Sequence, residues 1–108
     1  NDGTQADSWL FGGSYNETGS YMQEIQSGFV VSGSTESFGQ GLYDIWVIST
    51  DNSGNEIYNQ TFGGSMDDKA LGGGKGDNGE ALIIGYTGSF GNGGEDILVI
   101  KIDPNYQP

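Results

Sequence analysis

The chain has 108 residues, the size of one small domain, and it carries 15 acidic residues against 3 lysines, which gives a formal net charge of −12. A field of this sign repels phosphate backbones and anionic lipid surfaces, so it argues against a nucleic-acid partner. The chain has no His, no Cys and no Arg, so disulfides and Cys-ligated metals are excluded and the usual bases and nucleophiles of enzymes are missing. No apolar run approaches the ~20 residues of a membrane-spanning helix. We therefore expect neither membrane insertion nor catalysis.

Short β-branched and aromatic runs, separated by turns rich in Gly, Ser and Asn, predict an all-β chain without helices. The run 43–50 is the most apolar and is typical of a strand that is buried on both faces. Residues 15–19 and 33–41 are expected to form loops, and 69–75 is an unusual strand because it contains three consecutive glycines. The expected strands, in chain order, are 8–11 (the end of a strand), 20–25, 29–32, 43–50, 56–62, 69–75, 80–86 and 95–103.

The turn at 51–55 has the sequence Asp-Asn-Ser-Gly-Asn. The carboxylate of Asp51 can accept hydrogen bonds from backbone amides, and Gly54 or Asn55 can adopt a positive φ. We therefore expect a tight turn between the strands 43–50 and 56–62.

The chain repeats itself at a shift of 51 or 52 positions. A strand with the sequence Asp-Ile-Trp-Val-Ile returns as Asp-Ile-Leu-Val-Ile, and both copies follow a Gly-rich stretch. Each cycle of about 52 residues contains four short strands, which is the length and strand count of a propeller blade. The matching stretches are 11–14 with 62–65, 33–41 with 85–93, and 44–48 with 96–100.

Both cycles contain Phe-Gly-Gly, Gly-x-Thr-x-Ser-Phe-Gly-x-Gly and Asp-Ile-x-Val-Ile, and the first adds Asp-x-x-Gly-Asn. This pattern resembles the β-propeller repeats of secreted bacterial and archaeal proteins, over residues 9–103. The resemblance implies an all-β fold of two four-stranded antiparallel units, shaped like propeller blades, and a secreted or surface-exposed setting, but it implies no activity. The chain departs from the pattern at the glycines 72–74 and in its second copy, which lacks the Asp-x-x-Gly-Asn turn and the fourth strand.

These units divide the chain into an orphan N-terminal strand at 1–11, a first unit at 12–62 and a second unit at 63–108 without its fourth strand. The ends of the two units are therefore staggered. Two units are too few for a closed propeller, which has about four to eight. We expect either a piece of a larger secreted propeller protein or head-to-tail association of several copies.

In the second case one copy donates a strand to another. Trp9, Leu10 and Phe11 of one copy are expected to pair with the strand 95–103 of the next, which satisfies backbone groups that would otherwise stay unpaired. The copies then form a ring if the rotation between them closes, and a filament if it does not.

Asp44 and Asp96 occupy equivalent positions after the Gly-rich stretches. We expect each carboxylate to tie down loop amides. The alternative is a calcium site that they form with Glu95 or with loop carbonyls, because hard cations prefer oxygen ligands; no other cofactor is expected. A carboxylate pair could also hydrolyse a glycoside, but acidic residues this abundant form pairs by chance. The candidates for such a pair are Asp67, Asp68, Glu95 and Asp96.

Two sequons, at 16–18 and 59–61, make Asn16 and Asn59 candidates for N-glycosylation if the protein is exported. Together with the absence of Cys and the polar composition, they favour an extracellular or cell-surface location.

Phe38 and Phe90 are equivalent and are expected to pack their loops rather than to stack on sugars. The aromatic residues that could line a carbohydrate groove are Trp9, Tyr15, Tyr21, Trp46 and Tyr58, although Trp46 lies in the strand expected to be buried. From these features we expect a non-catalytic extracellular module that acts as a self-assembling scaffold. The leading alternative is a lectin-like propeller whose partners are glycans.

Overall fold

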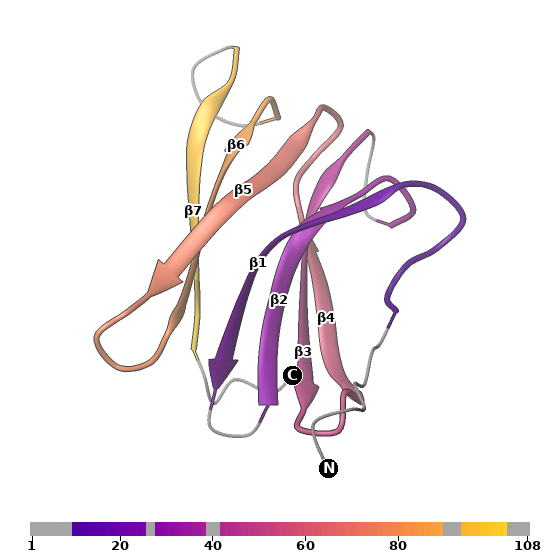
Figure 1. Cartoon of the computed structure of the whole chain (residues 1–108). Coiled ribbons are helices and arrows are strands. Elements are labelled where there is room, and N and C mark those ends of the chain that lie inside the picture. Colours follow the sequence, from indigo (N-terminus) through magenta and orange to yellow (C-terminus); the bar gives the residue numbers. More distant parts are fainter. Residues whose placement is uncertain (1–9, 26–27, 39–41, 90–93, 104–108) are drawn as a thin grey trace.

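The computed structural model describes residues 10–25, 28–38, 42–89 and 94–103, which form seven strands in two antiparallel sheets (Figure 1). The first sheet has the order β1-β2-β3-β4 and the second has the order β5-β6-β7. No helix occurs in these ranges, and so none that is long and apolar enough to cross a membrane. The all-β expectation is confirmed. The strands are β1 Glu17–Ile25, β2 Gly28–Thr35, β3 Asp44–Asp51, β4 Glu56–Phe62, β5 Asp68–Lys75, β6 Ala81–Thr87 and β7 Asp96–Ile102.

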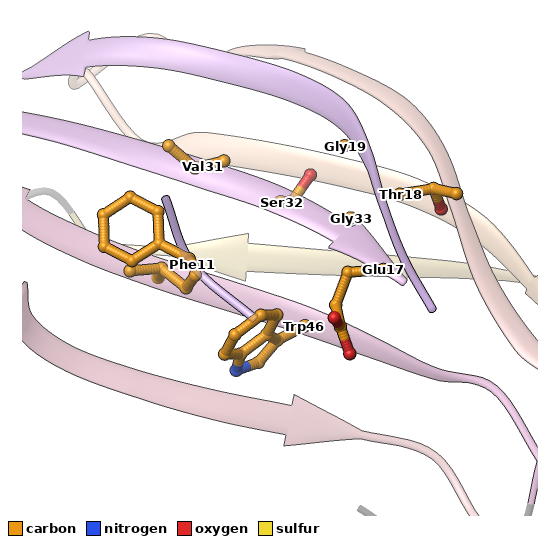
Figure 2. A pocket seen from close by; sticks show the side chains of 9 residues that line it. Phe11, Glu17, Thr18, Gly19, Val31, Ser32, Gly33 and Trp46 are labelled. Carbon is orange, nitrogen blue, oxygen red and sulfur yellow. The ribbon is translucent and has the colours of Figure 1, made fainter. Parts of the chain in front are cut away.

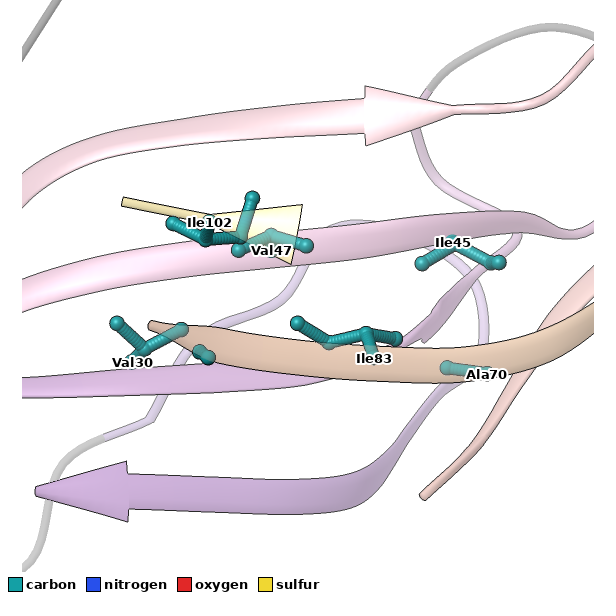
Figure 3. Close-up of a cluster of buried hydrophobic side chains, with 7 residues drawn as sticks. Val30, Ile45, Val47, Ala70, Ile83 and Ile102 are labelled. Carbon is teal, nitrogen blue, oxygen red and sulfur yellow. The ribbon is translucent and has the colours of Figure 1, made fainter. Parts of the chain in front are cut away.

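The two sheets pack face to face, with β5 lying against β1, β2 and β3. Their facing side chains form one apolar core, drawn in Figure 3. The first sheet contributes Val30, Ile45 and Val47, and the second contributes Ala70, Ala81, Ile83 and Ile102. Each aliphatic side chain buried in this way stabilises the fold by roughly 1.5–3 kcal/mol. As expected, β3 is buried along nearly its whole length.

Two strands extend into segments that the sequence analysis assigned to loops. β1 begins at Glu17 and β2 continues to Thr35, and these two residues pair with each other. The expected loops 15–19 and 33–41 were therefore wrong at these ends. Pairing with a neighbouring strand satisfies the backbone groups of Gly- and Ser-rich segments whatever their intrinsic preference.

The glycine-rich strand β5 is confirmed, and its composition has a packing reason. Gly73 pairs with Ile83, and a Cβ on Gly73 would lie 2.8 Å from the ring of Tyr21 on β1. The same Cβ would overlap the carbonyl oxygen of Leu82 on β6. The neighbouring strand and the facing sheet together therefore require a residue without a side chain here.

The expected strand end at 8–11 is not found at Leu10 and Phe11, which belong to no strand. Leu10 is 98% exposed. Trp9 lies outside the described residues.

The repeat relates the two sheets residue by residue. Asp44 begins β3 and pairs with Thr35, while Asp96 begins β7 and pairs with Thr87. Asp44 and Asp96 therefore occupy equivalent positions, as expected. β4 has no equivalent strand among the described residues of the second sheet.

Candidate functional site

A carboxylate at the start of β1 ties the loop before it to the end of β2. Glu17 accepts hydrogen bonds from the amide of Gly13 (3.2 Å) and the hydroxyl of Thr35 (2.9 Å). Thr35 Oγ1 in turn accepts the amide of Ser37 at 2.9 Å, and Ser37 Oγ accepts the amide of Tyr15 at 2.8 Å. The hydroxyl of Ser37 and these other donors hold the pKa of the Glu17 carboxyl below its ordinary value, against a smaller opposing effect of burial.

The same network recurs in the second sheet around Asp68. This carboxylate accepts the amide of Gly64 (3.0 Å), the hydroxyl of Ser89 (2.9 Å) and the hydroxyl of Thr87. Thr87 Oγ1 accepts the amide of Ser89 at 3.1 Å, and Ser89 Oγ accepts the amide of Met66 at 3.1 Å. The second glycine of the repeated Phe-Gly-Gly, and the threonine and serine of the repeated Gly-x-Thr-x-Ser, thus supply the hydrogen bonds of one repeated corner.

Glu17 was not singled out from the sequence, and Asp68 was considered only as one of a possible pair of hydrolytic carboxylates. Glu17 and Asp68 are difficult to match because they are different amino acids. They are also related by a shift of 51 positions, whereas the repeated strand 44–48 recurs at a shift of 52. The signal that identifies them is an acidic residue four positions after the second glycine of Phe-Gly-Gly, in both copies.

The two sheets meet at Gly63. A Cβ on this residue would lie 2.6 Å from Asp44 Oδ1 and 2.6 Å from Asp68 Oδ2, so carboxylates from β3 and β5 adjoin here. Asp44 is 1% exposed and Asp68 is 0% exposed. Beside them, the amide of Asp68 donates to the carbonyl of Tyr43 (2.7 Å), and the amide of Tyr43 donates to Asp67 Oδ1 (3.1 Å). We call this contact the sheet junction.

The candidate calcium ligands are divided between the two sheets. Asp44 is buried at the sheet junction beside Asp68, whereas Asp96 is partly buried and Glu95 is exposed at the start of β7. In the described ranges no group of three His, Cys, Asp or Glu side chains is arranged to hold a metal ion. Calcium binding by these residues stays a prediction.

The four carboxylates considered for glycoside hydrolysis have unlike surroundings. Asp68 is fully buried and accepts the three hydrogen bonds given above, so it cannot contact a substrate. Asp67 and Glu95 line one open cavity, and Asp96 is not among the residues that line it.

Both sequon asparagines are exposed. Asn16 lies immediately before β1, and Asn59 lies on β4, where its amide donates to Glu56 Oε2 at 2.7 Å. Their exposure is compatible with glycosylation, which stays a prediction.

The aromatic candidates are not equally accessible to a sugar. Trp46 and Tyr58 are buried, with exposed fractions of 7% and 6%. Tyr15 is exposed, and Tyr21 is partly buried with its hydroxyl donating to Gln23. The ring of Phe38 packs on Trp46 with 4.9 Å between centroids, as expected for a residue that packs its loop. Trp9 and Phe90 lie outside the described residues.

A groove runs between β4 of the first sheet and the end of β7 in the second. Its volume is about 250 Å³, and it lies beside the edge of β7 with which no described strand pairs. The lining residues are Tyr58, Gln60, Phe62, Ile100, Lys101, Ile102 and Asp103.

A second cavity, of about 170 Å³, lies on the face of the first sheet that points away from the second (Figure 2). Phe11, Val31, Trp46 and Ile48 give it an apolar wall, and Glu17 stands at its rim.

No protein-family model and no curated protein sequence matches the chain. Inferences about function therefore rest on the contacts described above.

The Glu17 corner predicts an acid-sensitive contribution to stability. Because folding lowers the pKa of Glu17 below its ordinary value of 4.5, the ionised carboxylate stabilises the fold above about pH 4.5. This contribution is lost as the pH falls through the lowered pKa. Urea unfolding should therefore show that Glu17→Gln destabilises the protein at neutral pH and that its difference from the wild type shrinks in acid. Glu24→Gln, at an exposed position on β1, is the control for the charge change. A Glu17→Gln effect that is constant with pH would contradict the assignment.

Proposed function

We propose that the chain is a non-catalytic, extracellular structural module of the β-propeller-repeat type, which assembles head to tail with copies of itself. The observation that carries the proposal is the edge of β7. In the first sheet the equivalent strand, β3, pairs with β4 along this edge, but in the second sheet no described strand takes that place. An edge of this kind exposes amides and carbonyls that readily pair with another chain.

The groove beside β7 supports the proposal because apolar side chains line it next to the end of β7. It is bounded by β4 on one side and by the end of β7 on the other. A strand paired with β7 would contact the groove side chains Tyr58, Phe62 and Ile100, in the same way that β4 lies beside β3.

The repeat supports one choice of donor strand and of its register. In the first sheet Phe62 pairs with Ile45. Phe11 is equivalent to Phe62, and Ile97 is equivalent to Ile45. We therefore place Phe11 of one copy opposite Ile97 of another. By the same shift Leu10 lies opposite Leu98, and the exposed state of Leu10 in the single chain leaves it accessible for this pairing.

Further units of a longer chain could fill the same edge, and a lectin-like propeller is the alternative function. The burial of Trp46 and Tyr58 removes two of the five aromatic candidates for a sugar-binding groove, which favours the scaffold. The exposed sequons at Asn16 and Asn59 support the extracellular setting.

Sedimentation equilibrium over a range of concentrations tests the proposal. The chain has a mass of 11.4 kDa, and we expect multiples of this mass that increase with concentration. Deleting residues 1–11 should return the protein to the monomer mass, whereas deleting residues 1–4 should leave the assembly intact. A wild-type chain that stays monomeric throughout would refute self-assembly. An assembly that survives deletion of 1–11 would show that this segment is not the connector.

A further inference from the structure

Two strands with nearly the same sequence have opposite exposure in this chain. Ile45 and Val47 on β3 are each 0% exposed, because they face the second sheet. Their equivalents on β7, Ile97 and Val99, are 79% and 62% exposed. Ile84 on β6 pairs with Val99, so both side chains lie on the same face. We define Ile84, Ile97 and Val99 as the outer face of the second sheet.

The opposite end of the molecule carries the complementary surface. In the second sheet the side that faces the core includes Ile83, Leu98 and Ile100. Their equivalents in the first sheet are Val31, Trp46 and Ile48, which line the 170 Å³ cavity (Figure 2). Trp46 and Ile48 are only 7% and 3% exposed in the single chain, so a partner reaches them through this cavity. Met22 pairs with Val31 and is 57% exposed on the same side. We define Met22, Val31, Trp46 and Ile48 as the outer face of the first sheet.

We infer that the outer face of the second sheet packs on the outer face of the first sheet of another copy, in the arrangement that the two sheets adopt within one chain. The inference rests on the proposed function and specifies its interface. Each chain carries both halves of a contact that it already forms once internally, so the same contact can continue between copies. An interface of this kind is head to tail, because the two patches differ.

Phe11 links this packing to strand donation. In the single chain Phe11 lines the cavity beside Trp46 (Figure 2). When Phe11 pairs with Ile97 of another copy it leaves that wall of the cavity. The cavity then becomes accessible to the outer face of the same neighbour, so both contacts form together.

The sheet junction also has an equivalent at this interface. Gly12 corresponds to Gly63, which is crowded by Asp44 and Asp68. In the single chain a Cβ on Gly12 would meet only the flexible carboxylate of Glu17. Asp96 of the neighbouring copy would complete the crowding, which explains why a glycine stands at an otherwise tolerant position.

Two variants block the two faces separately. Ile97→Asp changes the outer face of the second sheet, and Met22→Asp changes the outer face of the first. Both side chains are exposed, so each variant should fold, as circular dichroism and melting of the dilute proteins can verify. Leu42→Asp is the matched control, because Leu42 is also exposed, at 54%, but lies on neither face.

Sedimentation measures the outcome. We expect Ile97→Asp and Met22→Asp alone to require about tenfold or higher concentration for assembly, and Leu42→Asp to behave as the wild type. An equimolar mixture of the two blocked variants should form a two-chain species, because it restores one intact pair of faces. If the wild type assembles and Ile97→Asp assembles equally well, the face packing is wrong while strand donation stands. If the blocked variants fail to complement each other, the contact is not head to tail. A monomeric wild type would refute the proposed function together with this inference.

Discussion

Ile45→Ala is expected to lower the free energy of unfolding by about 2–5 kcal/mol, the usual cost of deleting a large aliphatic side chain from a well-packed core. Ile45 is 0% exposed, and its cluster joins both sheets, so the cavity would weaken the contact between them. A domain of this size has only about 0.05–0.15 kcal/mol of stability per residue. The variant should therefore be largely unfolded under mild denaturing conditions, measured by urea titration.

Ile97→Ala is the matched control because it makes the same change at the equivalent position. In dilute solution, where the chains are separate, Ile97 is 79% exposed and its replacement should cost less than about 0.5 kcal/mol. If the chains assemble as we propose, the cost should rise toward that of Ile45→Ala at high protein concentration. Equal effects of both variants on the dilute monomer would contradict the assigned faces.

Gly63→Ala is expected to cost roughly 2–5 kcal/mol, since it combines steric overpacking with an unfavourable backbone conformation. The φ of Gly63 is +157°, and a Cβ there would lie 2.6 Å from both Asp44 Oδ1 and Asp68 Oδ2. Relief requires the two buried carboxylates to move, which would pull Asp68 away from Thr87 and Ser89. Thermal or urea unfolding at neutral pH measures the loss.

Gly72→Ala provides the control in the adjacent strand. Nothing lies within 4 Å of the position that a Cβ would take on Gly72. Its replacement should change stability by less than about 0.5 kcal/mol. Similar losses for Gly63→Ala and Gly72→Ala would show that the sheet junction is not the cause.

Some residues of the repeat recur because they hold the corners of the fold together. The second glycine of Phe-Gly-Gly, the threonine and the serine recur in each copy because they bond the same acidic position, Glu17 in the first and Asp68 in the second. The Asp-Ile-x-Val-Ile strand has a packing role in the first copy, where Ile45 and Val47 face the second sheet, and we propose that the second copy uses the same face toward another chain. Among the described strands, the edge of β7 has no paired neighbour and Ile84, Ile97 and Val99 are exposed, and this is where we propose that a partner binds.

Local chemistry let the sequence determine much of the fold by itself. The strand Glu56–Phe62 was expected at its observed bounds. The turn before it forms as predicted, with Asp51 Oδ1 accepting the amides of Ser53 and Asn55 at 2.9 Å and Gly54 at a φ of 85°. The equivalence of Asp44 and Asp96 followed from the repeat alone. In each case the interacting groups are close in sequence or are related by a fixed period.

Only the tertiary structure decided which members of the repeat are buried. Ile45 and Ile97 have the same side chain and the same position in their strands. Ile45 is 0% exposed because the second sheet covers it, whereas Ile97 is 79% exposed. In the sequence Gly63 is indistinguishable from other turn glycines. In the structure it lies against the carboxylates of Asp44 and Asp68, which come from two different strands. Glu17 is linked to residues as far away in sequence as Thr35. Burial and such contacts depend on which segments meet in space, and neither composition nor period specifies that.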